Sequence, residues 1–163
     1  MKKRIVHSYA RFSSAKQAAG DSDRRQTEGA EAFCKRHDFS LANVRYFDKA
    51  KSGFAKSKQR QRDELLRAID DGRIASGDIL LIESFDRLSR RGINETSRLC
   101  MGIMDAGVSI AVLSPAEKIY EASDTNNLGN AIEIVLGGHQ ANAYSALISN
   151  KLKDYHAEQR RLA

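Results

Sequence analysis

The sequence has few of the residues that commonly hold metals, disulfides or membrane spans. Its two cysteines, Cys34 and Cys100, are far apart and form no CxxC pair, so neither a zinc site nor a disulfide framework is indicated. We expect both thiols to be small buried apolar groups. No apolar run approaches the roughly 18 residues of a membrane span, and the basic start at residues 1–4 is followed by too short an apolar stretch for a secretory signal. We therefore expect a cytoplasmic protein with no membrane partner.

Motifs of several common enzyme classes are also missing. The chain contains no GxSxG, GxxxxGK[ST] or GxGxxG pattern, which argues against a lipase-like hydrolase, a P-loop NTPase and a dinucleotide-binding enzyme. Its four histidines, His7, His37, His139 and His156, do not stand in the context of a catalytic triad. Chemistry carried by this chain therefore needs a different set of groups.

What the sequence does have is an excess of positive charge on a chain of one-domain length. In 163 residues, Lys and Arg outnumber Asp and Glu by 27 to 21, which gives a net charge of +6 and a pI near 9.4. Such a length buries a real core without staples, and such a charge favours polyanionic partners without proving one.

Strand-like and helix-like segments alternate along the chain. Strands are expected at residues 4–9, 41–47, 78–83 and 108–113, and helices at 24–37, 62–72 and 93–106. The third and fourth strand segments are nearly continuous apolar runs, which are typical of strands buried on both faces of a parallel sheet. We predict an α/β fold with a doubly wound, mostly parallel sheet of four to five strands, helices on both faces, and a long C-terminal helix.

The C-terminal part departs from this alternation. Residues 114–126 contain the only proline, Pro115, and are expected to form a loop. A long helix is then predicted from about residue 127 to 161, with an apolar stripe that gives way to a basic tail. This division predicts two parts, residues 1–126 and 127–163, and the charged helical end leads us to expect a further domain beyond it.

Polar side chains collect where the predicted strands end. In a parallel sheet the carboxyl ends share one rim, so the ends of the first and third strands should bring together Arg11, Ser13, Asp86, Arg87 and Arg90. Asp48 and Ser52 follow the second strand, and a polar loop, expected to be mobile, leads from there to Arg60. Arginines are frequent near these strand ends and loops: Arg11, Arg24, Arg25, Arg60, Arg62, Arg87, Arg90 and Arg91.

Several arginines around one hydroxyl indicate phosphoryl transfer. Attack on a phosphodiester develops negative charge on its oxygens, and guanidinium groups match those oxygens better than ammonium groups do. The same positive charge favours the serine alkoxide over the alcohol, so a dedicated histidine base is not required.

The motifs, taken in order, resemble a known family. They are Tyr9-x-Arg11-x-Ser13-Ser14, Ser22-x-x-Arg25-Gln26, Asp48 with Ser52-Gly53, Arg60, and Asp86-Arg87-Leu88-Ser89-Arg90. As a set they resemble the resolvase/invertase family of serine site-specific recombinases over nearly the whole chain. The Ser-x-x-Arg-Gln element and the long connection after Asp48 look most like the catalytic domain of large serine integrases.

The resemblance implies a role for each matched residue. Ser13 would be the nucleophile that forms a 5′-phosphoserine bond and releases a 3′-hydroxyl. Arg11, Arg60, Arg87 and Arg90 would bind the scissile phosphate and stabilise the transition state. Gln26, Asp48 and Asp86 would organise the site, with Asp86 also a candidate proton donor, and Tyr9 and Ser52 would support it. No metal or cofactor is implied.

Several of these residues also have a structural interpretation. Arg11 and Arg87 could be structural ion-pair residues, and the alignment of Arg60 could slip to Arg62. Asp48 and Asp86 could simply anchor arginines. Tyr9 could be a packing aromatic residue, and Gln26 could belong to a capping box in which Ser22 or Asp23 caps the helix.

The resemblance also implies partners. These are double-stranded DNA and further copies of the chain, as a dimer and as a tetramer in synapsis, in a nucleoid-associated protein. Residues 127–163 would serve subunit pairing and DNA approach, and a DNA-binding domain would follow Ala163. The long helix departs from the family pattern at Tyr144, where glutamate is usual, and at Lys151, where arginine is usual. The rival function is a non-catalytic, resolvase-like module for assembly or DNA guiding; a third, a flavodoxin-like phosphatase, would turn over simple phosphate esters.

Overall fold

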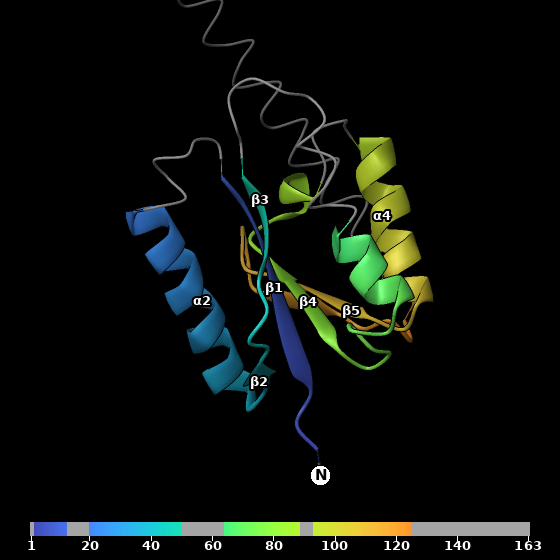
Figure 1. Ribbon diagram of the computed structural model, residues 1–163, viewed down its shortest axis with the longest axis horizontal. Coiled ribbons are helices and arrows are strands. Elements are labelled where there is room, and N and C mark those ends of the chain that lie inside the picture. The colour runs from blue at the N-terminus through green and yellow to red at the C-terminus, as the bar shows by residue number, and fades with distance from the viewer. Residues whose placement is uncertain (1, 13–19, 50–63, 89–92, 125–163) are drawn as a thin grey trace, which may run out of the picture.

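The fold is built on one mostly parallel sheet. A computed structural model of the chain describes residues 2–12, 20–49, 64–88 and 93–124 (Figure 1). Its six strands are β1 (Ile5–Phe12), β2 (Ser40–Leu41), β3 (Tyr46–Lys49), β4 (Ile79–Ile82), β5 (Ser109–Val112) and β6 (Lys118–Tyr120). The order is β2-β1-β4-β5-β6, with β3 also paired to β1, and all pairs except β5–β6 are parallel.

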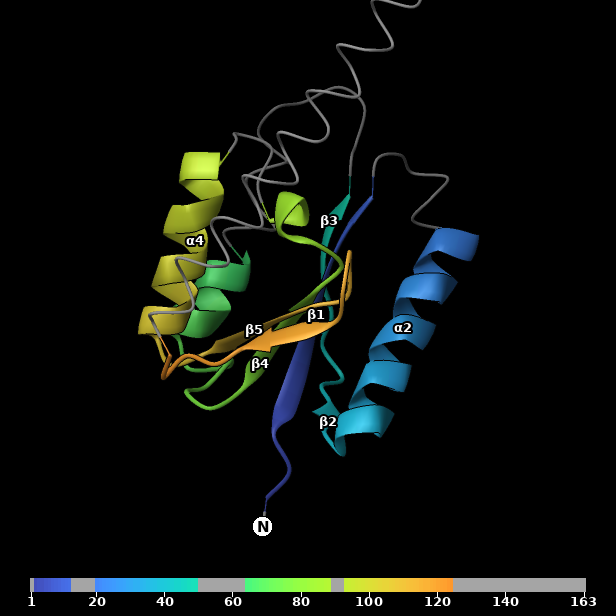
Figure 2. The same ribbon diagram turned by 180° about the vertical axis from the view of Figure 1, so that it is seen from behind.

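Helices cover both faces of the sheet (Figures 1 and 2). On one face, α2 (Asp21–His37) buries Ala30, Phe33 and Cys34 against Val6, Ile79, Leu81 and Ala111. On the other, the helical residues 64–70 and α4 (Ile93–Asp105) bury Leu65, Ala68, Cys100, Ile103 and Met104 against Tyr9, Leu80, Ile82, Ile110 and Val112. The predicted doubly wound α/β fold is thus confirmed.

The second predicted strand, residues 41–47, is divided in the structure. β2 pairs with the start of β1 at Ile5 and Val6, whereas β3 pairs with its end from Tyr9 to Phe12. Between them the chain leaves the edge of the sheet, and Arg45 turns toward α2, where it forms an ion pair with Asp23. The expectation of one continuous strand was therefore wrong, because Arg45 has a partner off the sheet.

The loop predicted at residues 114–126 contains a strand. β6 pairs antiparallel with β5, with Tyr120 opposite Ile110 and Lys118 opposite Val112. Tyr120 is buried and its ring lies 5.4 Å from that of Phe85 between centroids. This expectation was wrong because a three-residue strand is too short for its alternation of exposed and buried residues to stand out in a sequence.

The long helix predicted from residue 127 to 161 lies outside the described residues, so the division into residues 1–126 and 127–163 stays a prediction. In the part of the chain that the structure describes, no helix is long and apolar enough to cross a bilayer. Both cysteines are buried, as predicted, and their thiols are free. Burial raises the pKa of the Cys100 thiol to about 12, so this thiol is unreactive at neutral pH.

Candidate active site

The carboxyl ends of β1, β3 and β4 meet at one rim of the sheet. The register places Arg11 of β1 opposite Asp48 of β3, so the predicted neighbourhood of these two backbone positions is present. The side chain of Asp48 lies outside the described part of the structure. So do Ser13, Ser52, Arg60 and Arg90, which follow the rim in sequence. Their predicted roles stay predictions.

A cavity of about 420 Å3 opens at this rim, between the strand ends and α2. Its described lining residues are Ser8, Tyr9, Arg11, Arg25, Gln26, Leu81, Ile82, Glu83, Arg87, Leu113 and Ser114. Four of the predicted site residues, Tyr9, Arg11, Gln26 and Arg87, are therefore brought together. They come from three elements: β1, α2 and, far from both in sequence, η1, the short 3-10 helix Phe85–Arg87.

The cavity is rich in guanidinium groups. Arg11 from β1, Arg25 from α2 and Arg87 from η1 all line it, and Glu83 supplies one carboxylate among the described lining residues. The side chain of Arg11 is half-buried, and its Nη1 atom is fully buried. Such a concentration of positive charge in a partly desolvated hollow attracts an anion more strongly than the same charges spread over the surface.

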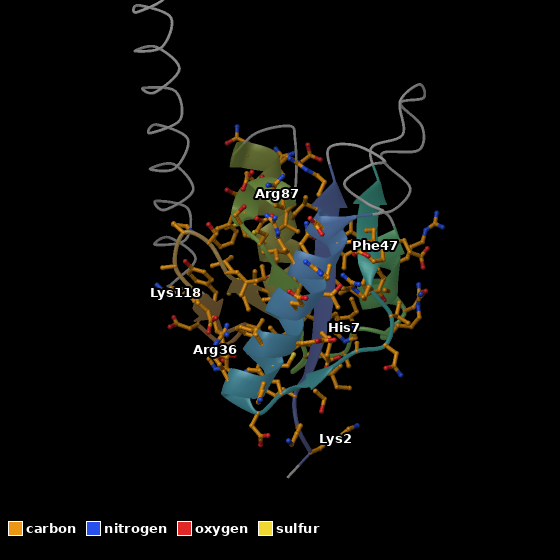
Figure 3. All side chains as sticks on the ribbon, turned by 90° about the vertical axis from the view of Figure 1, so that its left-hand side faces the viewer. Lys2, His7, Arg36, Phe47, Arg87 and Lys118 are labelled. Atoms are coloured by element: carbon orange, nitrogen blue, oxygen red, sulfur yellow. The ribbon has the colours of Figure 1, made fainter. Side chains whose placement is uncertain are left out.

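Arg87 is fixed by the core beneath it. The backbone N–H of Arg87 donates to the carbonyl of Ser84 at 3.0 Å, and that of Leu88 donates to the carbonyl of Phe85 at 3.1 Å. Phe85 and Leu88 are both buried. The turn that carries Arg87 is therefore anchored on either side by an apolar residue, and the guanidinium is presented at the rim (Figure 3).

Asp86, the neighbour of Arg87, points elsewhere. Its carboxylate is exposed and accepts a hydrogen bond from the hydroxyl of Ser84, and it is not among the described residues that line the cavity. The structure therefore does not bring Asp86 together with Arg11 and Arg87, because adjacent residues of a 3-10 turn leave its axis in different directions.

Gln26 does not cap the start of α2. Because α2 begins at Asp21 with Gly20 as its N-cap and no side-chain cap, Gln26 lies beyond the first turn, so the capping-box alternative was wrong. The N-cap is also neither Ser22 nor Asp23.

Tyr9 contributes to both the core and the cavity. It is 3% exposed and belongs to the buried cluster that includes Leu80, Ile82 and Ile110, yet it also lines the cavity.

The position of α2 is set at both ends. Near its start, Asp23 accepts a hydrogen bond from Arg45 at 3.3 Å, and the Arg45 guanidinium lies 4.9 Å from the centre of the Phe47 ring. Near its end, Arg36 and His37 both contact Glu117 of the β5–β6 connection. Hydrogen bonds from these two residues lower the pKa of the Glu117 carboxyl. The first turns of α2, which carry Arg25 and Gln26, are thus held beside the rim.

Arg25 and Glu83 line the cavity although the sequence analysis gave them no role. Arg25 stands inside the Ser22-x-x-Arg25-Gln26 motif, which was a signal for it. Glu83 ends the third predicted strand four residues before Arg87. Because the two residues lie in a strand end and in the turn after it rather than in one helix, their spacing gave no signal for the ion pair that joins Glu83 to Arg87. Among the described residues, no group of three or more His, Cys, Asp or Glu side chains could hold a metal ion.

Comparisons with known proteins agree with this architecture. A family model of the resolvase N-terminal domain matches residues 6–162. The uncharacterized protein YbcK of Escherichia coli (strain K12) is 34% identical over 157 residues, which cover 94% of this chain and 30% of YbcK. The chain thus spans less than a third of that relative's length.

Two solved structures have a similar fold. A resolvase family site-specific recombinase from Streptococcus pneumoniae superposes with a TM-score of 0.64 at 19% identity, covering 94% of this chain and 99% of that one. The N-terminal catalytic domain of TP901-1 integrase gives 0.55 at 16% identity, covering 86% and 98%. At these identities the two structures speak for the fold alone. The family model, which spans nearly the whole sequence, shows that the chain belongs to the resolvase N-terminal domain family.

Proposed function

We propose that this chain is the catalytic domain of a serine site-specific DNA recombinase, which cleaves and rejoins DNA by transesterification. The observation that carries the proposal is the rim cavity, where β1, α2 and η1 each supply an arginine, Arg11, Arg25 and Arg87. Membership of the resolvase family supports the same conclusion, because its chemistry needs a cluster of this kind beside a serine.

The arginines suit the charge that develops during attack on a phosphodiester. The equatorial oxygens gain negative charge in the transition state, and preorganised guanidinium donors stabilise that charge more than they stabilise the ground state. Arg87 is held by its anchored turn, and Arg11 by its strand. The backbone that carries each arginine is therefore already in place when the reaction occurs.

Ser13 is the proposed nucleophile. It follows β1 directly, two residues after Arg11. Its oxygen attacks the phosphorus and loses its proton, the bond from phosphorus to the 3′ oxygen breaks, and that oxygen leaves as a 3′-hydroxyl after taking up a proton. The 5′-phosphoserine keeps the energy of the broken ester, so attack by another 3′-hydroxyl rejoins the DNA without ATP.

The remaining residues complete the proposed set. Arg60 and Arg90 bind the scissile phosphate with Arg11 and Arg87. Gln26, Asp48 and Asp86 organise the site, Tyr9 and Ser52 support it, and Asp86 serves as a candidate proton donor that must leave Ser84 to do so.

The proposed partners are double-stranded DNA and further copies of the chain. The net charge of +6 favours a polyanion, and the segment 127–163 is the proposed element for subunit pairing and for approach to DNA. Dimers would join as a tetramer during synapsis, in a cytoplasmic, nucleoid-associated protein. Because YbcK is much longer than its matched region, target recognition is proposed to belong to a further domain.

The test is capture of the covalent intermediate. The catalytic chain, in its full-length protein or fused to a DNA-binding domain of known target, is incubated with supercoiled DNA and quenched with detergent. The wild type should give DNA with protein joined to its 5′ ends, and Ser13→Ala should give none while still binding DNA, because the hydroxyl supplies the bond but little of the affinity.

Ser114→Ala is the matched control, because Ser114 also lines the cavity and the same atom is removed. This variant should keep the adduct. An adduct that persists in Ser13→Ala would refute the nucleophile. A wild type that pairs DNA sites but never forms an adduct would instead support the non-catalytic assembly module.

A further inference from the structure

The rim cavity carries a carboxylate that phosphate chemistry does not need. Glu83 is the only acidic residue among the described side chains that line the cavity. It stands at the end of β4, where its backbone carbonyl accepts hydrogen bonds from the N–H groups of Leu113 at 3.2 Å and Ser114 at 2.8 Å. The residue is thus fixed at the rim by its main chain, while its side chain is half exposed and able to move.

The side chain of Glu83 is paired with a proposed phosphate ligand. Its Oε2 atom lies 3.2 Å from Nε of Arg87, four residues later in the chain. The contact is close but poorly aligned, since Nε of Arg87 is buried and has no hydrogen-bond partner among the described residues. Because Nε is buried with the Glu83 carboxylate beside it, a phosphate oxygen could reach it only after that carboxylate has moved, and would then make the bond that the carboxylate leaves unmade.

We propose that Glu83 is a resident counter-anion of Arg87, which occupies the guanidinium until a DNA phosphate displaces it and so weakens the empty site for DNA. This inference rests on the proposed function, and it adds to it a residue that acts through Arg87 rather than on the substrate. The carboxylate opposes phosphate binding in two ways. It competes for the same donor, and its charge repels the incoming phosphate.

The consequence is that the site binds DNA weakly until a phosphate is correctly placed in it. Displacing Glu83 costs the ion pair, and that cost is recovered only when the phosphate is placed well enough to engage Nε of Arg87 in line. A loosely placed phosphate recovers less of it. Glu83 therefore favours well-positioned DNA over casual contact, as a competing group does in other discriminating sites.

The test is equilibrium DNA binding with Glu83→Gln, in a Ser13→Ala background of the full chain so that no cleavage contributes. Glutamine keeps the shape and removes the charge. Fluorescence anisotropy with a short labelled DNA duplex at about 0.1 M salt should show Kd lowered about threefold to tenfold, the scale of a partly exposed charge pair. Adding Arg87→Ala should reduce that gain by more than about half, because the two residues act on each other.

Glu117→Gln is the matched control. It makes the same change in net charge, but Glu117 contacts Arg36 at the far end of α2 from Arg87 (Figure 3), so Kd should change by less than about twofold once salt screens the distance. A second readout uses dimethyl phosphate, a phosphodiester without bases. The NMR signal of Nε–H of Arg87 should shift on titration, and at a lower concentration in Glu83→Gln.

Unchanged or weaker DNA binding by Glu83→Gln would overturn the inference, since Glu83 would then be idle or would orient Arg87. So would an equal gain from Glu117→Gln. Glu83→Ala should also lower Kd. The test therefore needs only one of the two variants, Glu83→Gln or Glu83→Ala, to fold. If Glu83→Gln does not lower Kd, the test of Ser13 as the nucleophile is unaffected. If the wild type forms no covalent adduct, the binding measurement on Glu83 remains valid.

Discussion

The ion pair between Arg45 and Asp23 should support the site from outside it. Arg45 leaves the sheet edge to hydrogen-bond Asp23 in the first turn of α2 at 3.3 Å, and the two side chains are 20% and 37% exposed. The same guanidinium lies over the Phe47 ring at 4.9 Å. Arg45→Ala removes both contacts, and with them the described side-chain link between the β2–β3 connection and the start of α2.

The magnitude follows from the two contacts. An ion pair of this exposure contributes about 0.5–1 kcal/mol, and a cation–π contact contributes a similar amount, about 0.5–1 kcal/mol. We therefore expect Arg45→Ala to lower the free energy of unfolding by about 1–2 kcal/mol. The loss is local, so amide hydrogen exchange in the first turns of α2 should rise first. Because Arg25 and Gln26 lie there, DNA binding should weaken about threefold to tenfold.

The control is Arg36→Ala, at the other end of the same helix. It also removes one positive charge and one ion pair, that with Glu117, but it lies away from the rim. Denaturant unfolding, hydrogen exchange and DNA anisotropy should be measured on both variants at one salt concentration. If Arg36→Ala weakens DNA binding as much as Arg45→Ala, the effect is one of charge or overall stability, and local support of the site is refuted.

Two further predictions concern the stability of the fold. Arg4 donates a hydrogen bond to Glu121 and lowers the pKa of the Glu121 carboxyl. This contact should therefore stabilise the fold fully above the ordinary carboxyl pKa, and its stabilisation should be lost as pH falls through the lower pKa of the folded state. Urea unfolding measured against pH should show a smaller loss of stability at low pH in Glu121→Gln than in the wild type. Gly107 has φ +82°, and a Cβ there would lie 2.8 Å from Cβ of Ser76, so Gly107→Ala should lower the urea midpoint by the equivalent of at least about 1–2 kcal/mol. Gly102→Ala, in open space within α4, should instead stabilise by about 0.5–1 kcal/mol.

The parts of the fold that could be predicted are those where one physical signal extends over many residues. β4 and β5 are buried on every residue, and this left nearly continuous apolar runs, which are typical of strands covered on both faces of a parallel sheet. The helices show a stripe of inward residues over several turns. β6 and the break between β2 and β3 left no such signal, because each depends on one or two residues whose partners, Phe85 for Tyr120 and Asp23 for Arg45, are distant in sequence.

The site was predictable to the same depth. The rule that parallel strands end at one rim requires only strand positions, and it placed Arg11 and Arg87 on the same side of the sheet without any knowledge of side chains. Which neighbour faces the cavity is decided by the rotation of a single turn. Buried Phe85 and Leu88 set that rotation, so Arg87 lines the cavity and Asp86 faces Ser84.

The same reasoning explains why the two unassigned residues of the cavity escaped notice. A motif names residues by type and spacing, and Arg25 was read as part of a motif whose assigned member was Gln26. Glu83 belongs to a strand by its position, and its carboxylate becomes relevant only because η1 turns Arg87 back over the end of β4, to 3.2 Å from it. That the negative charge of Glu83 lies in a proposed phosphate site can be recognised only once the position of η1 is known. That is why the proposed restraint on Arg87 comes from the geometry of β4 and η1 and not from the pattern of arginines.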